Sequence, residues 1–464
     1  MRVSVLIPEY DFKETHPEYV RSGFRDSERA GIPYVENPLG LMYLSSALKE
    51  NGHEVELIDG YFHNREDIID RLKQFEPDLV GIQATAPFWF RVKDISKQIK
   101  YILDVPIVVG GSHIRYAGGE IIGQSEHIDY GIVGDGEPAI VQLCEVLKGQ
   151  KKPEDVDGLF WKEEDNVQHA KNKTSEADLH ELPFPDREEF DLYRYRPSLH
   201  RELPVTSLIT ARGCKMGCLF CHAAADRYRT RKISDIISEM KEIEEQGIRE
   251  VLFYDQTMGA DRERLIKLCE EIIEQDFDFW LQGNLRIDEV DTEVIRKMKE
   301  AGFWKVCIGI ESGVQKSLNK LNKNIDVDKI KKAVEIVDSF DIQISGTFIL
   351  GIPGETKEEA RKTIEFAKEL PIDFVKFFPF TPFPGSPIYE NPENGKIKDD
   401  PLLLCQNRIN FVPETMTEEE LRQLIKNGTK EFYSRPGYIL RRIKKIRTFE
   451  DIKQNILGAL AYIF

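Results

Sequence analysis

Two runs of alternating short apolar segments and amphipathic helical patterns constrain the fold of this chain most strongly. The first run occupies residues 1–150. Strands are expected at 3–7, 54–58, 79–83, 107–109 and 130–133, with helical patterns such as 39–51 and 90–103 between them. Regular strand–helix alternation is typical of a parallel sheet covered by helices on both faces. We therefore predict an α/β domain over residues 1–150.

The second run begins near residue 201 and extends to residue 385. Its expected strands are 205–210, 250–254, 279–283, 305–309, 343–350 and 374–379. Its expected helices are 232–246, 261–275, 291–301, 326–340 and 356–370. Six strand–helix units predict a partial or complete parallel barrel, which places reactive groups on loops at the carboxyl ends of the strands.

The remaining segments lack this regularity. Residues 151–200 are charged and poor in long apolar runs, so we expect a linker with a small hairpin near 158–161. Residues 386–464 are expected to form a mostly helical C-terminal segment. It contains a basic run at 441–447 and an apolar end at 456–464. Such a segment either packs on the barrel or lies on an anionic membrane surface.

Composition excludes several classes of protein. The formal net charge of −17 argues against general nucleic-acid binding. No run of 18 apolar residues is present, so no membrane span is expected. Seven cysteines in 464 residues do not form a disulfide framework, and the scattered ones are interpreted as buried thiols of a cytoplasmic protein: Cys144, Cys269, Cys307 and Cys405.

The other three cysteines lie in one short loop directly after the first strand of the second run. Cys214, Cys218 and Cys221 have C-x3-C-x2-C spacing. Soft thiolate ligands select an iron–sulfur cluster or zinc. Three thiolates leave one iron of a 4Fe–4S cluster open to a small molecule. Zinc would need a fourth ligand, for which His222 is the near candidate, and a disulfide with a spare thiol is a third possibility.

Other motifs carry a family resemblance. They are Gly-Ile-Glu-Ser-Gly at 309–313, Leu-Gly-Ile-Pro-Gly-Glu-Thr at 350–356, Thr-Pro-Phe-Pro-Gly-Ser-Pro at 381–387, and the segments 52–59, 110–113 and 134–137. Together with the cysteine motif, they make almost the whole chain resemble the radical S-adenosylmethionine enzymes that carry an N-terminal cobalamin-binding domain. One departure is that the D-x-H-x-x-G motif of other cobalamin proteins is absent.

The resemblance implies a Rossmann-like cobalamin-binding domain, then a partial (β/α)6 barrel and the C-terminal helical segment. It also implies that Cys214, Cys218 and Cys221 hold a 4Fe–4S cluster whose open iron binds S-adenosylmethionine. Residues expected to contact S-adenosylmethionine are Tyr254, Asp255, Gln256, Asn284, Arg286, Glu311, Ser312 and Gly351. Arg286 would grip the carboxylate. The alternative for Arg286 and Glu311 is an ordinary surface ion pair.

For cobalamin, the resemblance implies a pocket at the carboxyl ends of the first domain's strands. The expected lining residues are Thr85, Gly110, Gly111, Ser112, Gly134, Gly136 and Glu137. The alternative is that these glycines only form tight turns. His113 is a candidate cobalt ligand, although a loop histidine with a hydrogen bond is the simpler interpretation.

The activity implied by the resemblance is cobalamin-dependent methyl transfer to an unactivated carbon. The alternative within the family is radical C–C bond formation, cyclisation or rearrangement, on a small-molecule or lipid substrate. The electron donor would be a ferredoxin or flavodoxin. A non-catalytic iron–sulfur carrier is a weaker alternative. A methylthiotransferase is disfavoured, because only Cys144 precedes Cys214 and a second cluster would need more cysteines.

Overall fold

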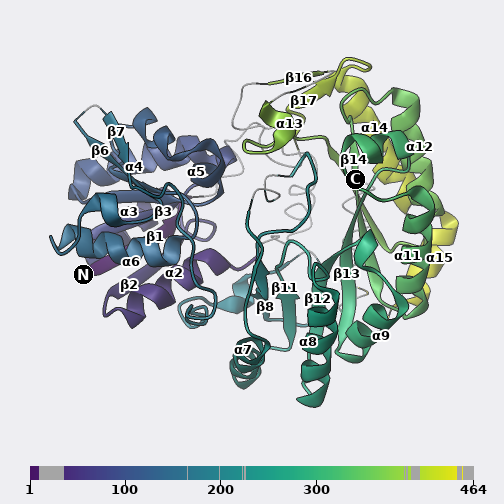
Figure 1. The fold of residues 1–464 in the computed structure, drawn as a ribbon, viewed down its shortest axis with the longest axis horizontal. Coiled ribbons are helices and arrows are strands. Elements are labelled where there is room, and N and C mark those ends of the chain that lie inside the picture. Colours follow the sequence, from purple (N-terminus) through teal and green to yellow (C-terminus); the bar gives the residue numbers. More distant parts are fainter. Residues whose placement is uncertain are drawn as a thin grey trace. The chain divides into compact units, whose positions relative to one another are not determined.

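The computed structural model describes residues 1–9, 36–164, 166–197, 199–221, 223, 226–390, 392, 395–398, 408–446 and 452. Its contacts divide the chain into two compact units (Figure 1). Of the described residues, the first unit comprises 1–9 and 38–191, and the second comprises 36–37 and those from 192 onward.

The first unit is built on one sheet with strand order β2-β1-β3-β4-β5-β6-β7. The strands are β1 (Arg2–Ile7), β2 (Glu54–Asp59), β3 (Leu79–Gln83), β4 (Ile107–Gly110), β5 (Tyr130–Ile132), β6 (Leu159–Glu163) and β7 (Asn166–His169). The helices are α2 (Leu39–Glu50), α3 (Arg65–Phe75), α4 (Trp89–Leu103), α5 (Ser112–Ala117) and α6 (Gly136–Leu147). The first five strands in this order are parallel, as predicted.

Helices cover both faces of this sheet because its buried strands are apolar on both sides. Ile68 of α3 and Val92 of α4 belong to one core cluster, and Leu41 of α2 and Ile140 of α6 belong to the other. Order 2-1-3-4-5 has a switch point beside β1, where open sheets of this kind bind ligands at their carboxyl edge.

Residues 151–191 differ from the expected linker. The predicted hairpin exists as β6 and β7, but β6 also pairs with β5 in antiparallel orientation and so extends the first sheet. A strand that adds to a sheet edge satisfies its own backbone groups and those of the edge. Most of this segment therefore folds as part of the first unit.

The second unit is a six-stranded parallel sheet with order β15-β14-β13-β12-β11-β8, which confirms the partial barrel. The strands are β8 (Val205–Leu208), β11 (Glu250–Phe253), β12 (Trp280–Arg286), β13 (Phe303–Glu311), β14 (Gln343–Leu350) and β15 (Phe374–Pro379). The helices between them are α7 (Ile233–Glu245), α8 (Arg262–Glu274), α9 (Thr292–Glu300), α10 (Gln315–Lys320), α11 (Val327–Ser339) and α12 (Lys357–Glu369). Figure 1 shows α8, α9, α11 and α12 on the outer side of the strands.

The first strand of this sheet ends earlier than predicted. β8 stops at Leu208, and the chain then forms β9 (Ala211–Arg212), which pairs in antiparallel orientation with β10 (Arg229–Thr230). This two-residue ladder joins both ends of the cysteine loop. The loop therefore has a fixed base next to the carboxyl end of β8.

The C-terminal segment contains α13 (Pro387–Glu390), the hairpin of β16 (Gly395–Ile397) and β17 (Phe411–Pro413), α14 (Glu418–Tyr433) and α15 (Pro436–Lys444). None of the helices in the described ranges is long and apolar enough to cross a membrane. The apolar end at 456–464 lies outside the described residues.

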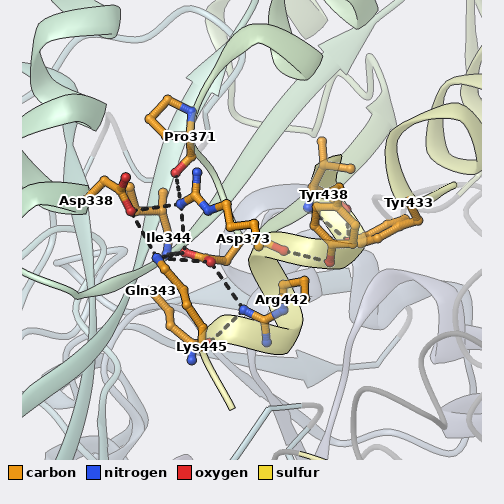
Figure 2. Close-up of polar contacts among 11 residues, drawn as sticks. Asp338, Gln343, Ile344, Pro371, Asp373, Tyr433, Tyr438, Arg442 and Lys445 are labelled. Carbon is orange, nitrogen blue, oxygen red and sulfur yellow. Dashed lines mark hydrogen bonds and ion pairs between the residues drawn. The ribbon is translucent and has the colours of Figure 1, made fainter. Parts of the chain in front are cut away.

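Basic residues at the end of α15 bind carboxylates of the barrel (Figure 2). Arg442 Nη1 lies 3.2 Å from Asp373 Oδ1, and Lys445 Nζ lies 3.2 Å from the same carboxylate. Lys445 Nζ and Arg441 Nη2 also bind Asp338 Oδ1, at 3.0 Å and 2.8 Å. Asp373 is fully buried and also accepts the amide of Ile344. The described part of the basic run is thus used in packing on the barrel, and membrane association is not supported.

We expect Lys445→Gln to loosen α15 by about 1–3 kcal/mol, because the variant removes one of the cations that compensate the buried Asp373. Hydrogen exchange of the α15 amides should become faster, with little change in the barrel strands. Lys426→Gln, on the exposed side of α14, is the matched control. Unchanged exchange in Lys445→Gln would show that the ion cluster does not hold the helix.

Candidate functional site

The base of the cysteine loop is held by a buried carboxylate at the end of β11. Asp255 accepts the Thr210 amide at 2.7 Å and the Ala211 amide at 3.2 Å, and it also bonds the Thr210 hydroxyl. Gly213 continues the loop with φ +80°, and a Cβ there would lie 2.1 Å from Arg227 O. Only glycine fits this position. The Asp255 carboxylate thus anchors the cysteine loop, and the expected contact of Asp255 with S-adenosylmethionine stays a prediction.

The tip of the loop is held by the segment that follows α10. The Leu219 amide donates to Leu321 O at 3.1 Å, and Asn322 Nδ2 donates to Gly217 O at 2.7 Å. Asn322 has φ +52°, a left-handed conformation that asparagine adopts more readily than most residues. The cysteine loop is therefore held at its base and at its tip by the protein itself.

The thiols of Cys218 and Cys214 accept hydrogen bonds. Arg286 Nη1 lies 3.2 Å from Cys218 Sγ, and the Met216 amide lies 3.4 Å from Cys214 Sγ. N–H donors to sulfur are a regular feature of thiolates that bind iron–sulfur clusters. Burial raises the pKa of the Cys214 thiol, so metal binding must displace its proton.

The donor set fits a 4Fe–4S cluster. Among the described residues, no three His, Cys, Asp or Glu side chains converge as ligands of a single metal ion. Ligands of a cubane cluster need not converge, because each thiolate binds a different iron. His222, the fourth ligand of the zinc alternative, lies outside the described residues.

A buried ion pair lies at the end of β13. Lys323 Nζ is 2.7 Å from Glu311 Oε1, and the two side chains are only 5% and 8% exposed. Glu311 has φ +66°, and the pairing of β13 with β14 is irregular between Gly309 and Glu311. Left-handed backbone at a non-glycine residue and β-bulges both concentrate at functional sites, where they redirect a side chain.

Gly309 makes room for this ion pair. A Cβ at residue 309 would lie 2.5 Å from Glu311 Oε1 and 3.0 Å from Lys323 Nζ. The glycine of this motif therefore serves the placement of the carboxylate. Glu311 is not the surface ion pair of the alternative interpretation, because both partners are buried.

Side chains at the end of β11 alternate in direction. Tyr254 and Gln256 are exposed, while Asp255 between them is buried. Asn284, at the end of β12, is partly buried and donates from Nδ2 to Asp255 O at 2.9 Å. Tyr254, Gln256 and Asn284 thus remain candidates for contacts to S-adenosylmethionine.

Two other residues expected to contact the ligand make packing contacts at the strand ends. Ser312 is fully buried, and its hydroxyl lies 2.9 Å from that of Thr363 in α12. Gly351 has φ +79°, and a Cβ there would lie 2.7 Å from Leu421 of α14. Both residues therefore serve the contact of strand ends with helices, and their expected contacts with S-adenosylmethionine stay predictions.

Glu355, which is hydrogen-bonded to Gly351, is expected to make the stability of the fold depend on pH. Its carboxylate accepts the Gly351 amide at 2.7 Å, yet burial raises its pKa from 4.5 to about 7. A raised pKa in the folded state stabilises the fold at low pH, and this contribution is lost as the pH rises through about 7. We expect the thermal stability of Glu355→Gln relative to the unmodified chain to increase from about pH 5 to about pH 8. A difference that is constant over this range would contradict the assignment.

Four predicted cobalamin residues meet at the carboxyl ends of β3 and β4. The Ala84 amide donates to Gly110 O at 2.7 Å, which brings Thr85 next to Gly110, Gly111 and Ser112. Gly111 has φ +107°, and a Cβ there would lie 2.8 Å from Ala84 O. Gly111 and Ser112 are exposed, so their backbone is open to a ligand.

The other three follow β5, at the same edge of the sheet. Gly134 has φ +105° and bridges to Ser175, whose O would lie 2.2 Å from a Cβ at residue 134. Position 134 therefore requires glycine because the Ser175 backbone packs against it. Gly136 lies against Leu44, and Glu137 is buried in the first turn of α6.

His113 is a buried residue of α5 that packs on Trp89, with ring centroids 5.2 Å apart. Burial lowers its pKa to about 4, so the ring is neutral at pH 7. Nε2 has no hydrogen-bond partner among the described residues, unlike the bonded histidine of the simpler interpretation. The His113 ring nitrogen without a hydrogen-bond partner and the exposed backbone of Gly111 and Ser112 lie at the same edge of the sheet. Both features are compatible with binding of a large polar cofactor such as cobalamin.

The sequence interpretation missed the residues that link these strand ends. Lys323, Asn322, Asp288 and Glu289 hold the predicted residues in place. The Glu289 carboxylate bonds the Thr257 hydroxyl and accepts the Arg286 amide at 2.9 Å. The one available signal was the Asn-Lys-Asn run at 322–324, because asparagines outside helices often mark left-handed turns.

Comparisons with known proteins agree with this architecture. The family model described as the radical SAM superfamily matches residues 208–367, and that of the B12 binding domain matches residues 29–144. An uncharacterized methyltransferase of Pyrococcus horikoshii is 30% identical over 91% of this chain and 93% of its own length. Cytidylyl-2-hydroxyethylphosphonate methyltransferase of Streptomyces wedmorensis is 25% identical over 88% of each protein. The anaerobic magnesium-protoporphyrin IX monomethyl ester cyclase of Cereibacter sphaeroides is 25% identical over 90% of this chain and 69% of its own length.

Among solved structures, the cobalamin-dependent S-adenosylmethionine radical enzyme OxsB superposes with a TM-score of 0.73. The match covers 99% of this chain and 72% of that one, at 16% identity, and thus concerns the fold. The match to the Pyrococcus protein shows that the relationship also holds at the level of sequence, because it covers most of both chains. The chain belongs to the radical S-adenosylmethionine superfamily, in the group whose members carry an N-terminal B12-binding domain.

Proposed function

We propose that this chain is a cobalamin-dependent radical S-adenosylmethionine methyltransferase that acts on an unactivated carbon. The observation that carries the proposal is the three-cysteine loop at the carboxyl end of a barrel strand. In this loop the Cys218 sulfur accepts a hydrogen bond from the charged side chain of Arg286. Two methyltransferase relatives, from Pyrococcus horikoshii and Streptomyces wedmorensis, are each matched over most of their length and support methyl transfer.

Cys214, Cys218 and Cys221 would hold the cluster, and the residues near Thr85 and Gly110–Ser112 would contact the corrin. When bound, the cluster supplies an electron that cleaves S-adenosylmethionine, and cobalamin carries the methyl group. Tyr254, Gln256, Asn284 and Glu311 would orient S-adenosylmethionine. The electron comes from a low-potential donor of the ferredoxin or flavodoxin class.

Cofactor analysis of protein prepared without oxygen tests the proposal. We expect a full cluster and one corrin per chain after desalting. Reduction in the presence of S-adenosylmethionine should release both 5′-deoxyadenosine and S-adenosylhomocysteine, because methyl transfer uses one S-adenosylmethionine as radical source and another as methyl donor. Failure to retain corrin would contradict the proposal.

A radical cyclase is the second candidate, and the similarity to the magnesium-protoporphyrin IX monomethyl ester cyclase favours it specifically. A cyclase consumes S-adenosylmethionine only as radical source. Release of 5′-deoxyadenosine without S-adenosylhomocysteine would therefore support this candidate over methyl transfer.

A further inference from the structure

The side chain of Arg286 contacts the cysteine loop directly. It lies at the end of β12, is only 8% exposed, and its Nη1 is 3.2 Å from Cys218 Sγ. Cys218 is itself buried. A guanidinium that donates to a buried sulfur interacts strongly with it, because little water screens the contact.

The other guanidinium nitrogens are bonded as well. Nε lies 2.9 Å from Asp288 Oδ1, and Nη2 lies 3.2 Å from Asp288 Oδ2 and 3.1 Å from Lys323 O. The two-point contact with Asp288 fixes the plane of the guanidinium, as bidentate arginine–carboxylate pairs do. Arg286 is therefore already oriented toward Cys218, whereas the contact expected from the sequence was the carboxylate of S-adenosylmethionine.

We propose that Arg286 is a positioning residue for the cluster: it orients the Cys218 thiolate, and its charge raises the reduction potential of the cluster. This inference rests on the proposed function, because it requires a cluster on the three cysteines. A one-electron reduction by the low-potential donor makes the cluster and its thiolates more negative. A fixed positive charge and an N–H···S bond stabilise that state more than the oxidised one.

The test is a redox titration of cluster-loaded protein, monitored by electron paramagnetic resonance without S-adenosylmethionine. Arg286→Gln is expected to shift the midpoint potential to a more negative value, because the charge is lost. Arg286→Lys is expected to show a smaller shift, because lysine keeps the charge but cannot bind Asp288 at two points. Arg296→Gln, which removes an exposed arginine paired with Glu300, is the matched control and should leave the potential unchanged.

Binding of S-adenosylmethionine by equilibrium dialysis separates the two possible roles of Arg286. If Arg286→Gln keeps the original potential and loses S-adenosylmethionine binding, the residue acts on the ligand carboxylate and the proposal is overturned. If Arg286→Gln does not retain a cluster, Arg286→Lys decides, since loss of S-adenosylmethionine binding at an unchanged potential in that variant would also overturn the proposal. Absence of a cluster in the unmodified chain would instead contradict the proposed function.

Discussion

Replacing Cys218 by alanine is expected to abolish cluster binding and reductive cleavage of S-adenosylmethionine. The variant removes one of three protein ligands and leaves Arg286 Nη1 facing the space of the lost sulfur. A buried cationic donor without its partner costs about 1–3 kcal/mol or more, so the loop should also lose order. Iron and sulfide content, the visible absorbance of the cluster and 5′-deoxyadenosine release are the measurements.

Cys269→Ala is the matched control for this prediction. Cys269 is a fully buried thiol of α8, outside the cysteine loop, and burial raises its pKa to about 12. Its replacement should lower stability by about 1 kcal/mol and leave iron content unchanged. The cluster assignment would be wrong if Cys218→Ala kept its iron and sulfide, or if purified protein held zinc in place of iron.

Much of the scaffold could be predicted because its signals are local. The predicted boundaries of α8, α9, α11 and α12 are close to the observed ones. Each of these helices begins after a residue whose side chain accepts a backbone amide, and these N-caps are Asp261, Asp291, Asp326 and Thr356. The parallel sheets followed from apolar strand patterns, and the cysteine spacing indicated the candidate cluster site.

The side chains of the site were harder to predict because their direction depends on where each strand ends. Tyr254 and Gln256 are exposed while Asp255 is buried, and a shift of one residue would reverse this assignment. Two positions require glycine because a residue distant in the sequence occupies the space of a side chain. Ser175 does so at Gly134, and Leu421 does so at Gly351. No local pattern indicates which remote residue will occupy the space that glycine leaves.

Lys323→Met is the second variant expected to have a large effect. It leaves the Glu311 carboxylate buried without its cation, on a backbone held at φ +66°. Breaking a buried pair by removing one partner costs about 3–5 kcal/mol. We therefore expect a clear drop in thermal stability of the barrel, whereas Lys329→Met, at an exposed position on α11, should behave like the unmodified chain.

The same variant should weaken S-adenosylmethionine binding if Glu311 contacts that ligand. A charge-assisted hydrogen bond contributes about 1.5–3 kcal/mol, which corresponds to about a 10- to 100-fold change in Kd. Equilibrium dialysis of cluster-loaded protein measures this change. Lys323→Arg keeps a cation near the carboxylate and should recover part of both properties.

Combining Lys323→Met with Glu311→Gln separates stability from ligand binding. Removing both charges eliminates the buried carboxylate, so stability should return toward that of the unmodified chain. Binding should remain weak, because the carboxylate that orients S-adenosylmethionine is absent. If the double variant regains both stability and affinity, Glu311 serves only the fold of β13. If it regains stability alone, the strained backbone at Glu311 is retained because it presents this carboxylate to the ligand.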